Sequence, residues 1–292
     1  MLEWIITSQE SNLKLIHFLS QKLKDQYSAR FIKNVIERNG CKINGKTERF
    51  ASTILVQGDH VSLHIEQKTE AHLSKIEKQR ILYEDDALFV YNKPAGISCD
   101  EKGILQLLHS YLPSLKLVHR LDKDTTGVLL LAKQAIVFEY LVDQFKQFKV
   151  TKRYQAIVDG CVNSSKGIIK NYLGKKKAFA GQTIWGAVSS SQGVYACTKW
   201  ICLKKTKQAS LLICVPQTGR THQIRVHMAE MGHPILGDHQ YGKDFQCLYH
   251  ASRYLLHAEE IFFQHPVTKS HVSFMAPLPD DFMKAQETLF KG

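Results

Sequence analysis

Apolar residues near the start of the chain follow a helical spacing. They recur every three or four positions over residues 15–23 and again over residues 31–36, so each set would form one buried face of a helix. Ser28 stands where the N-cap of the second helix belongs, and Gly40 stands at its C-terminal end. The pattern therefore predicts two consecutive short helices, preceded by a short lead-in over residues 1–12.

Strand signals follow these two helices. Residues 41–43 and 53–56 are predicted strands, and apolar and polar residues alternate over residues 60–65. The pairs Asn44-Gly45 and Gly58-Asp59 are of the type that forms tight turns. Two helices on a short hairpin predict a compact N-terminal domain.

The pattern changes after residues 67–79, a polar stretch without apolar periodicity that we interpret as an interdomain linker between domains at residues 1–66 and 80–292. In the second domain, short segments rich in β-branched and aromatic residues predict strands, and two longer segments predict helices. The predicted strands are residues 81–83, 87–91, 128–132, 154–158, 194–203, 211–215 and 273–275, and the helices are residues 138–148 and 221–231. This order predicts an α+β fold with a mixed, largely antiparallel sheet and flanking helices.

Composition places the chain among globular proteins. Its 292 residues are 44% hydrophobic and 23% charged, which excludes disordered and fibrous classes and allows about two domains. The longest apolar runs are too short to span a membrane, and the first residues lack a signal-peptide pattern. The seven cysteines contain no C-x-x-C pair, as is typical of reduced thiols. We therefore expect a soluble cytoplasmic protein without a cysteine-bound metal.

The positive charge of the chain is concentrated in one stretch. The formal net charge is +12, and residues 144–207 contain thirteen lysines and arginines against a single acid, Asp159. A lysine-rich solvated face would explain a charge run of this kind. Confinement to one stretch favours a polyanionic partner, because each neutralised phosphate releases counterions. A membrane surface would need an amphipathic helix, which this stretch does not supply.

Two polar segments contain a candidate carboxylate and a candidate tyrosine. Asp122 lies between Arg120 and Lys123, whose positive charges would hold its carboxylate ionised. Taken alone, this pattern favours a carboxylate that caps a turn. Tyr154 lies in a predicted strand, where a tyrosine usually packs against its neighbours while its hydroxyl finds a partner.

A third polar segment, residues 216–228, combines a predicted turn with the start of a predicted helix and presents several hydrogen-bond donors. Its two histidines, His222 and His227, are possible metal ligands. Their spacing of five places them poorly on one helical face, and no H-E-x-x-H sequence is present. We therefore predict structural roles for both and no metal site.

Together these segments resemble the RluA-type family of pseudouridine synthases. The family motif H-R-L-D-x-x-T-S-G matches residues 119–127, with Thr126 in place of the usual serine. The motif K-x-Y-x-A-x-V-x-G matches residues 152–160, and G-R-x-H-Q-I-R-x-H matches residues 219–227. Further matches stand at residues 92–96, 231–238 and 255–258. The resemblance covers about residues 80–280, with the motifs in the family order.

This resemblance implies a mechanism and the residues that carry it. Asp122 would attack the ribosyl or base portion of a uridine, the glycosidic bond would break, and the uracil would turn and rejoin through C5. Arg225 would pair with Asp122, and Tyr154 would stack on the base and assist indirectly in removal of the C5 proton. Arg120 would fill the space left by the extruded base. No cofactor or metal is implied, because the carboxylate is the covalent catalyst.

The resemblance also implies structured RNA as the partner, with ribosomal RNA favoured over transfer RNA, and a monomeric state. Additional RNA contacts would come from His119, Arg220, Lys175, Lys176 and Lys177. Several short segments resemble a small RNA-binding module named after a small-subunit ribosomal protein, namely residues 15–19, 28–33, 35–36, 41–46 and 58–59. This second resemblance implies that Arg30 and Lys33 lie near phosphates.

Two other functions remain open from the residues alone. The first is a non-catalytic RNA-binding protein that assists ribosome assembly. The second is a nucleoside hydrolase with a carboxylate nucleophile. Glycoside hydrolysis generally needs a second carboxyl group, and Asp124 is the nearest candidate.

Overall fold

The computed structural model describes residues 2–24, 26–65, 76–179, 182–242 and 244–291. The chain divides into two compact units, Met1–His72 and Leu73–Gly292. Residues 67–75 of the predicted linker lie outside the described residues, so the predicted domain boundaries stay a prediction. No helix within these described ranges is long and apolar enough to cross a membrane.

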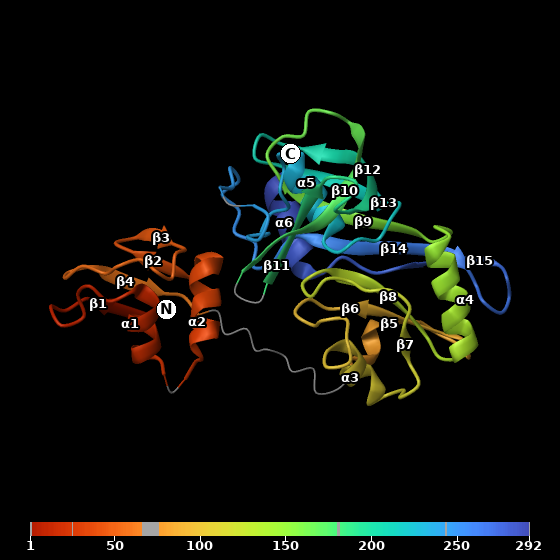
Figure 1. The fold of residues 1–292 in the computed structure, drawn as a ribbon, viewed down its shortest axis with the longest axis horizontal. Helices are drawn as coiled ribbons and strands as arrows, with labels where there is room; N and C mark the ends of the chain where they lie inside the picture. The colour runs from red at the N-terminus through yellow and green to blue at the C-terminus, as the bar shows by residue number, and fades with distance from the viewer. Residues whose placement is uncertain (1, 25, 66–75, 180–181, 243, 292) are drawn as a thin grey trace. The chain divides into compact units, whose positions relative to one another are not determined.

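The first unit is an antiparallel sheet of four strands with two helices (Figure 1). The elements are β1 (Leu2–Ile5), α1 (Leu15–Lys22), α2 (Ala29–Val35), a π-helical segment η1 (Ile36–Gly40), β2 (Cys41–Ile43), β3 (Lys46–Glu48) and β4 (His60–Leu63). The strands pair in the order β1-β4-β2-β3. Phe18 and Leu19 of α1, Ile32 of α2 and Val61 of β4 are fully or almost fully buried in one core, which explains the helical spacing of the apolar residues.

Some of the local structure predicted for the first unit is confirmed and some is wrong. The Ser28 hydroxyl accepts a hydrogen bond from the backbone N–H of Phe31 at 3.2 Å, which confirms the N-cap. Asn44 and Gly45 both have positive φ, so the turn is tight and the return strand begins directly after it, at Lys46–Glu48. The strand predicted at residues 53–56 is therefore wrong, since only an isolated bridge from Ile54 to Lys14 forms there. The predicted lead-in contains β1 instead.

The second unit is built on one mixed sheet. Its strands are β5 (Ile81–Glu84), β6 (Leu88–Lys93), β7 (Lys116–Leu117), β8 (Thr126–Ala132), β9 (Thr151–Asp159), β10 (Lys166–Phe179), β11 (Gln182–Val188), β12 (Val194–Lys205), β13 (Ala209–Pro216), β14 (Leu256–Gln264) and β15 (His271–Met275). The main order is β11-β10-β12-β13-β9-β14-β8-β6-β5. Only β14 and β8 pair in parallel among the described strands, so the predicted largely antiparallel sheet is confirmed.

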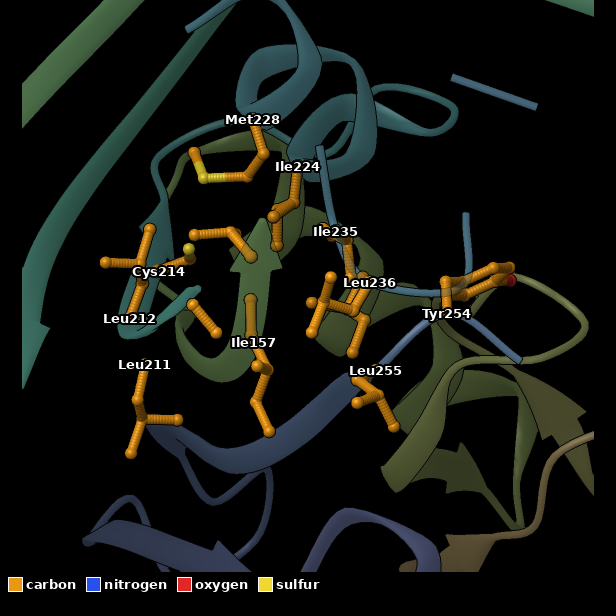
Figure 2. Close-up of a cluster of buried hydrophobic side chains, with 14 of the residues drawn as sticks. Ile157, Leu211, Leu212, Cys214, Ile224, Met228, Ile235, Leu236, Tyr254 and Leu255 are labelled. Atoms are coloured by element: carbon orange, nitrogen blue, oxygen red, sulfur yellow. The ribbon is translucent and has the colours of Figure 1, made fainter. Parts of the chain in front are cut away.

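Helices pack on both faces of this sheet (Figure 1). They are α3 (Ile104–His109), α4 (Ala135–Lys146), α5 (Gln223–Glu230) and α6 (Asp280–Phe290), and a short 3-10 helix η2 (Lys78–Arg80) precedes β5. Figure 2 shows Ile224 and Met228 of α5 directed toward Ile157 of β9 and Cys214 of β13. Helix α5 is thus fixed against the sheet by its apolar side chains.

The strand that follows the first motif is buried on both of its faces. Val128 and Leu130 of β8 belong to the core under α4, whereas Leu129 and Leu131 belong to the core around α3. This explains an apolar run without alternation. At the start of β8, Gly127 has φ 114°, and a Cβ there would collide with the backbone carbonyl of Ala258. The glycine lets β14 approach the end of the loop that carries Asp122.

Candidate active site

Asp122 lies in the loop between β7 and β8, and three buried side chains hold the backbone of this loop. The Lys93 ammonium donates to the carbonyl of Lys123 at 2.9 Å, and Arg253 donates to the carbonyl of Asp124 at 3.0 Å. The backbone N–H of Asp124 donates to the Tyr254 hydroxyl at 3.0 Å. These contacts use the main chain of the loop, so the Asp122 carboxylate stays 24% exposed.

The exposed carboxylate faces a cavity of about 830 Å³ in the second unit. Its walls come from the Asp122 loop, the C-terminal end of α4, the start of β9 and the segment that leads into α5. The lining residues that bear charge or a polar ring are His119, Arg120, Asp122, Lys123, Lys146, Lys152, Tyr154, Arg220, His222 and Arg225. Asp122 is the only carboxylate in this lining, as far as the described residues show.

Arg225, from the first turn of α5, points at Asp122. Its Nη1 lies 3.3 Å from an Asp122 carboxylate oxygen, as the resemblance implied. Nε and Nη2 donate to the two carboxylate oxygens of Asp238 at 2.6 and 2.9 Å, and Nη2 also donates to Gln240 at 2.9 Å. The fork on Asp238 is a strong bidentate arrangement, so it fixes the guanidinium in the orientation that reaches Asp122.

Two aromatic rings and the charge of Asp238 complete the surroundings of Arg225. Its guanidinium carbon lies 4.2 Å from the ring centroid of Tyr254 and 5.0 Å from that of Tyr241. Burial alone would lower the pKa of Arg225, but the hydrogen bonds and the charge of Asp238 outweigh it and raise the pKa. The guanidinium is therefore a permanent positive charge beside Asp122.

Tyr154 reaches the same cavity from β9. Burial raises the pKa of its phenol well above the ordinary value, and the charge of Asp122 raises it further. The hydroxyl therefore keeps its proton at neutral pH, and a phenolate is not available as a general base. Tyr154 lines the cavity, and its predicted roles in stacking on the base and in indirect proton removal stay predictions.

The histidines of the motifs take part in different contacts. His222 holds the Tyr241 hydroxyl at 2.7 Å through Nδ1 and places Nε2 4.0 Å from Asp122. His227 uses both ring nitrogens, with Thr198 at 2.8 Å and Asn171 at 2.9 Å, and lies away from the cavity. The two rings therefore do not converge. The contacts of His227 fit the structural role predicted for it, whereas His222 lines the cavity beside Asp122, so its structural role stays a prediction.

The predicted RNA contacts fall into three groups. Arg120 and Arg220 line the cavity, as does His119, although His119 accepts a hydrogen bond from the backbone N–H of Leu130 at 3.0 Å and stacks on Phe145. Exposed Lys175, Lys176 and Lys177 lie on β10, outside the cavity. In the first unit, Lys33 pairs with Glu37 at 3.7 Å, and the Arg30 side chain lies outside the described residues. Their contacts with RNA stay predictions.

The basic stretch of residues 144–207 is divided between the two faces of the sheet. Tyr154 pairs directly with Cys214, and Lys199 pairs with Val215 on one side and Ile168 on the other. Because neighbouring residues of a strand point to opposite faces, Lys199 lies on the face away from Tyr154. Only part of the positive charge therefore belongs to the cavity.

Several residues around the cavity had no role in the sequence analysis. Three of them, Lys93, Lys152 and Asp238, lie in stretches that match the family, and this match could have drawn attention to them. Nothing else in the local sequence distinguishes them from other charged residues. Thr126 keeps the hydroxyl of the motif and lies 2.9 Å from Nδ1 of His257. Arg253 joins the loop to α6 through Asp281, with contacts of 2.7 and 3.0 Å. These contacts connect segments that are far apart in the chain.

Two histidines, half-buried His119 and fully buried His227, predict a loss of stability in acid. Burial and the charge of Lys152 lower the pKa of His119 to about 3, and burial lowers that of His227 to about 4. Both values lie below the ordinary value of about 6.5, so the unfolded chain binds these protons first. Stability should fall as the pH drops below about 6.5, by at most roughly 1.4 kcal/mol per pH unit for each histidine.

Urea unfolding of the second unit at pH 7, 6 and 5 measures this effect. A His227→Gln variant should lose less stability between pH 6.5 and pH 5 than the unchanged protein. A His271→Gln variant, which alters an exposed histidine, should keep the original slope. An equal slope in the His227→Gln variant would contradict the assignment.

Fold and site together place one carboxylate, Asp122, beside an arginine in a cavity whose described lining holds no other acid. The sequence model of the RNA pseudouridylate synthase family matches residues 87–230. Ribosomal large subunit pseudouridine synthase C of Haemophilus ducreyi is 34% identical over 94% of this chain and 91% of its own length. Synthase D of Buchnera aphidicola (subsp. Schizaphis graminum) is 32% identical over 93% and 92%.

A solved structure agrees with these relatives. The human RNA Pseudouridylate Synthase Domain Containing 4 protein is 26% identical, covers 72% of this chain and 92% of its own, and superposes with a TM-score of 0.61. The chain belongs to the RNA pseudouridine synthase family, whose members are isomerases that convert uridine to pseudouridine in RNA.

Proposed function

We propose that this protein isomerises specific uridines of structured RNA, in the large ribosomal subunit, to pseudouridine with Asp122 as the nucleophile and without a cofactor. The relatives named as ribosomal large subunit synthases support this substrate. The observation that carries the proposal is the Asp122 carboxylate in the cavity, 3.3 Å from an arginine that Asp238 clamps.

The proposed reaction begins with extrusion of the uridine from its stack, which costs a few kcal/mol. Arg120 occupies the vacated space. Asp122 forms a covalent bond to the nucleotide, the bond from C1′ to N1 breaks, and the uracil turns within the cavity. A bond from C1′ to C5 then forms, the bond to Asp122 breaks, the C5 proton passes to solvent, and N1 is protonated. Tyr154 packs on the base during this rotation.

The lining of the cavity bears on the hydrolase alternative. An enzyme that hydrolyses glycosides through a carboxylate generally needs a second carboxyl group on the other side of the bond. Among the described residues that line the cavity, Asp122 is the sole carboxylate, and Asp124 is not part of the lining. This arrangement favours the isomerase. The proposal also includes a monomeric enzyme that acts in the cytoplasm, where ribosomes are assembled.

Release of tritium from RNA labelled at C5 of uracil tests the proposed function. The isomerase should release tritium to water and no free base. Release of free uracil would instead indicate a hydrolase, and absence of both products on ribosomal and transfer RNA would indicate a binding protein. Mapping of pseudouridine in ribosomal RNA from cells with and without the protein should identify the modified uridines.

A further inference from the structure

Lys152 places a positive charge in the wall of the cavity. Its side chain comes from β9, two residues before Tyr154, and lines the cavity. Its Nζ lies 3.4 Å from the carbonyl oxygen of Thr218, a long hydrogen bond, and 5.9 Å from the ring centroid of Phe145. Across the residues that the structure describes, no carboxylate oxygen lies within 4.0 Å of this ammonium.

Lys93 offers a comparison within the same unit. Lys93 is fully buried, whereas Lys152 is half-buried. The Lys93 ammonium donates to the carbonyls of Pro94 and Lys123 at 2.8 and 2.9 Å and lies outside the cavity lining. Support of the Asp122 loop explains Lys93. Among the described residues, Lys152 makes only one contact of this kind, the long hydrogen bond to the carbonyl of Thr218, and it lines the cavity, so its charge also faces the space that a ligand would occupy.

Arg220 adds a second positive charge to the same wall. It lines the cavity and donates through Nε to the carbonyl of Tyr195 at 3.0 Å, and it too has no carboxylate partner among the described residues. Burial and the charge of Arg220 lower the pKa of Lys152 to about 8. Two adjacent cations therefore destabilise each other, and an anion placed between them would remove this cost.

The segment between these cations leaves room for a ligand. A Cβ added to Gly219 would lie 3.6 Å from the Lys152 Nζ, and no other atom outside residues 218–220 lies within 4 Å of that position. The N-terminal end of α5, which begins at Gln223, opens on the same cavity, and the N-terminal end of a helix favours negative charge. The geometry and the charge both suit a phosphate group.

We propose that Lys152 and Arg220 form a subsite for one backbone phosphate of the RNA, next to the ribose on which Asp122 acts. This inference rests on the proposed function. A phosphate held at this point would fix the sugar of the extruded nucleotide relative to the nucleophile, and such positioning accelerates a reaction. Lys152 and Arg220 therefore contribute to catalysis through substrate orientation as well as affinity.

The test combines a change in the protein with a change in the RNA. The probe is a hairpin RNA that carries a uridine identified by the mapping experiment, with one neutral methylphosphonate placed 5′ or 3′ of that uridine. Each modified RNA is compared with a matching phosphodiester RNA that has the same 2′-deoxy substitution. For the unchanged enzyme, one of the two modifications should reduce kcat/KM roughly 10- to 100-fold, as expected for a lost charged hydrogen bond.

The Lys152→Gln variant should show a similar loss on the unmodified RNA. The methylphosphonate that slows the unchanged enzyme should reduce the kcat/KM of this variant by less than about threefold further. The reason is that the contact between Lys152 and the phosphate is already missing in the variant. A Lys146→Gln variant alters an exposed lysine of the cavity lining and should keep the full penalty of the methylphosphonate. A Lys152→Arg variant retains the charge and should recover part of the activity.

Equal methylphosphonate penalties in the unchanged enzyme and in Lys152→Gln would overturn the subsite. So would the absence of a penalty at either position in the unchanged enzyme. Thermal melting confirms that the variants fold, and Arg220→Gln allows the same comparison if Lys152→Gln does not fold. Failure of the unchanged enzyme to isomerise the unmodified hairpin would be a different result, because it would contradict the proposed function itself.

Discussion

An Asp122→Asn variant is expected to release tritium from labelled RNA at least roughly 10⁴-fold more slowly than the unchanged enzyme, the order of loss seen when a catalytic nucleophile is removed. Asparagine keeps the shape of the side chain, but a neutral amide is a poor nucleophile. It also loses the charge that attracts the Arg225 guanidinium at 3.3 Å. Because the Asp122 side chain is 24% exposed, the fold should be little affected.

The neighbouring acid provides a matched control for this prediction. Asp124 lies two residues further along the same loop, and it does not belong to the cavity lining. An Asp124→Asn variant should keep its rate within about tenfold of the unchanged enzyme, because its side chain does not face the substrate. Initial rates and melting curves of both variants decide the matter. An active Asp122→Asn enzyme would show that another group is the nucleophile.

The parts of the fold that could be predicted from sequence are those in which the local pattern and the buried surface agree. The apolar run of β8 is explained by helices on both of its faces, and α1 and α2 show the spacing of one buried side. In each case the residues that pack together are close in sequence or belong to a continuous apolar segment. Elements of this kind can be predicted without knowing which strand pairs with them.

Two long strands were missed for the opposite reason. The lysines and glycines of β10 are uncommon in strands, and its pairing with β11 and β12 decides its structure. Strand β14 contains Glu259, which is buried next to Arg153 at 2.8 Å and Gln155 at 2.8 Å. These partners lie on β9, about a hundred positions earlier in the chain. Charged residues look unsuited to a central strand until that pairing is known.

The candidate site shows the same division. Asp122, Tyr154 and Arg225 could be proposed from motifs, and the structure places all three around one cavity. The residues that hold them in place were not singled out by sequence, although Asp238 lies in a stretch that matches the family. Asp238 and Tyr254 act on Arg225 through a bidentate contact and a stacked ring, and both depend on the way loops meet in three dimensions. Sequence thus predicts the proposed reacting groups better than the residues that hold them in position.

Replacement of Arg225 by methionine is expected to reduce both activity and stability. Asp238 is 1% exposed and would lose its two charged hydrogen bonds from Arg225. A buried carboxylate left without its partner typically costs about 3–5 kcal/mol of stability. Asp122 would lose its aligned cation as well, and loss of such an electrostatic contact commonly slows catalysis roughly 10²- to 10³-fold. Urea unfolding and tritium release measure the two effects separately.

The double variant Arg225→Met with Asp238→Asn separates these two consequences. Neutralising Asp238 removes the unpaired buried charge, so roughly half or more of the lost stability should return. Activity should not return, because Asp122 still lacks its guanidinium partner. As a control, Arg80→Met breaks a partly exposed pair with Glu77 and should cost about 1 kcal/mol or less.

The pattern of the three variants carries more information than any one of them. If the Arg225→Met enzyme were as active as the unchanged one, the pairing of Asp122 with Arg225 would have no part in the reaction. If the double variant were no more stable than Arg225→Met, the clamp would not depend on the charge of Asp238. We expect the double variant to recover stability without recovering rate. That result would show that Asp238 holds the Arg225 guanidinium in place, and that this guanidinium in turn acts on the proposed nucleophile Asp122.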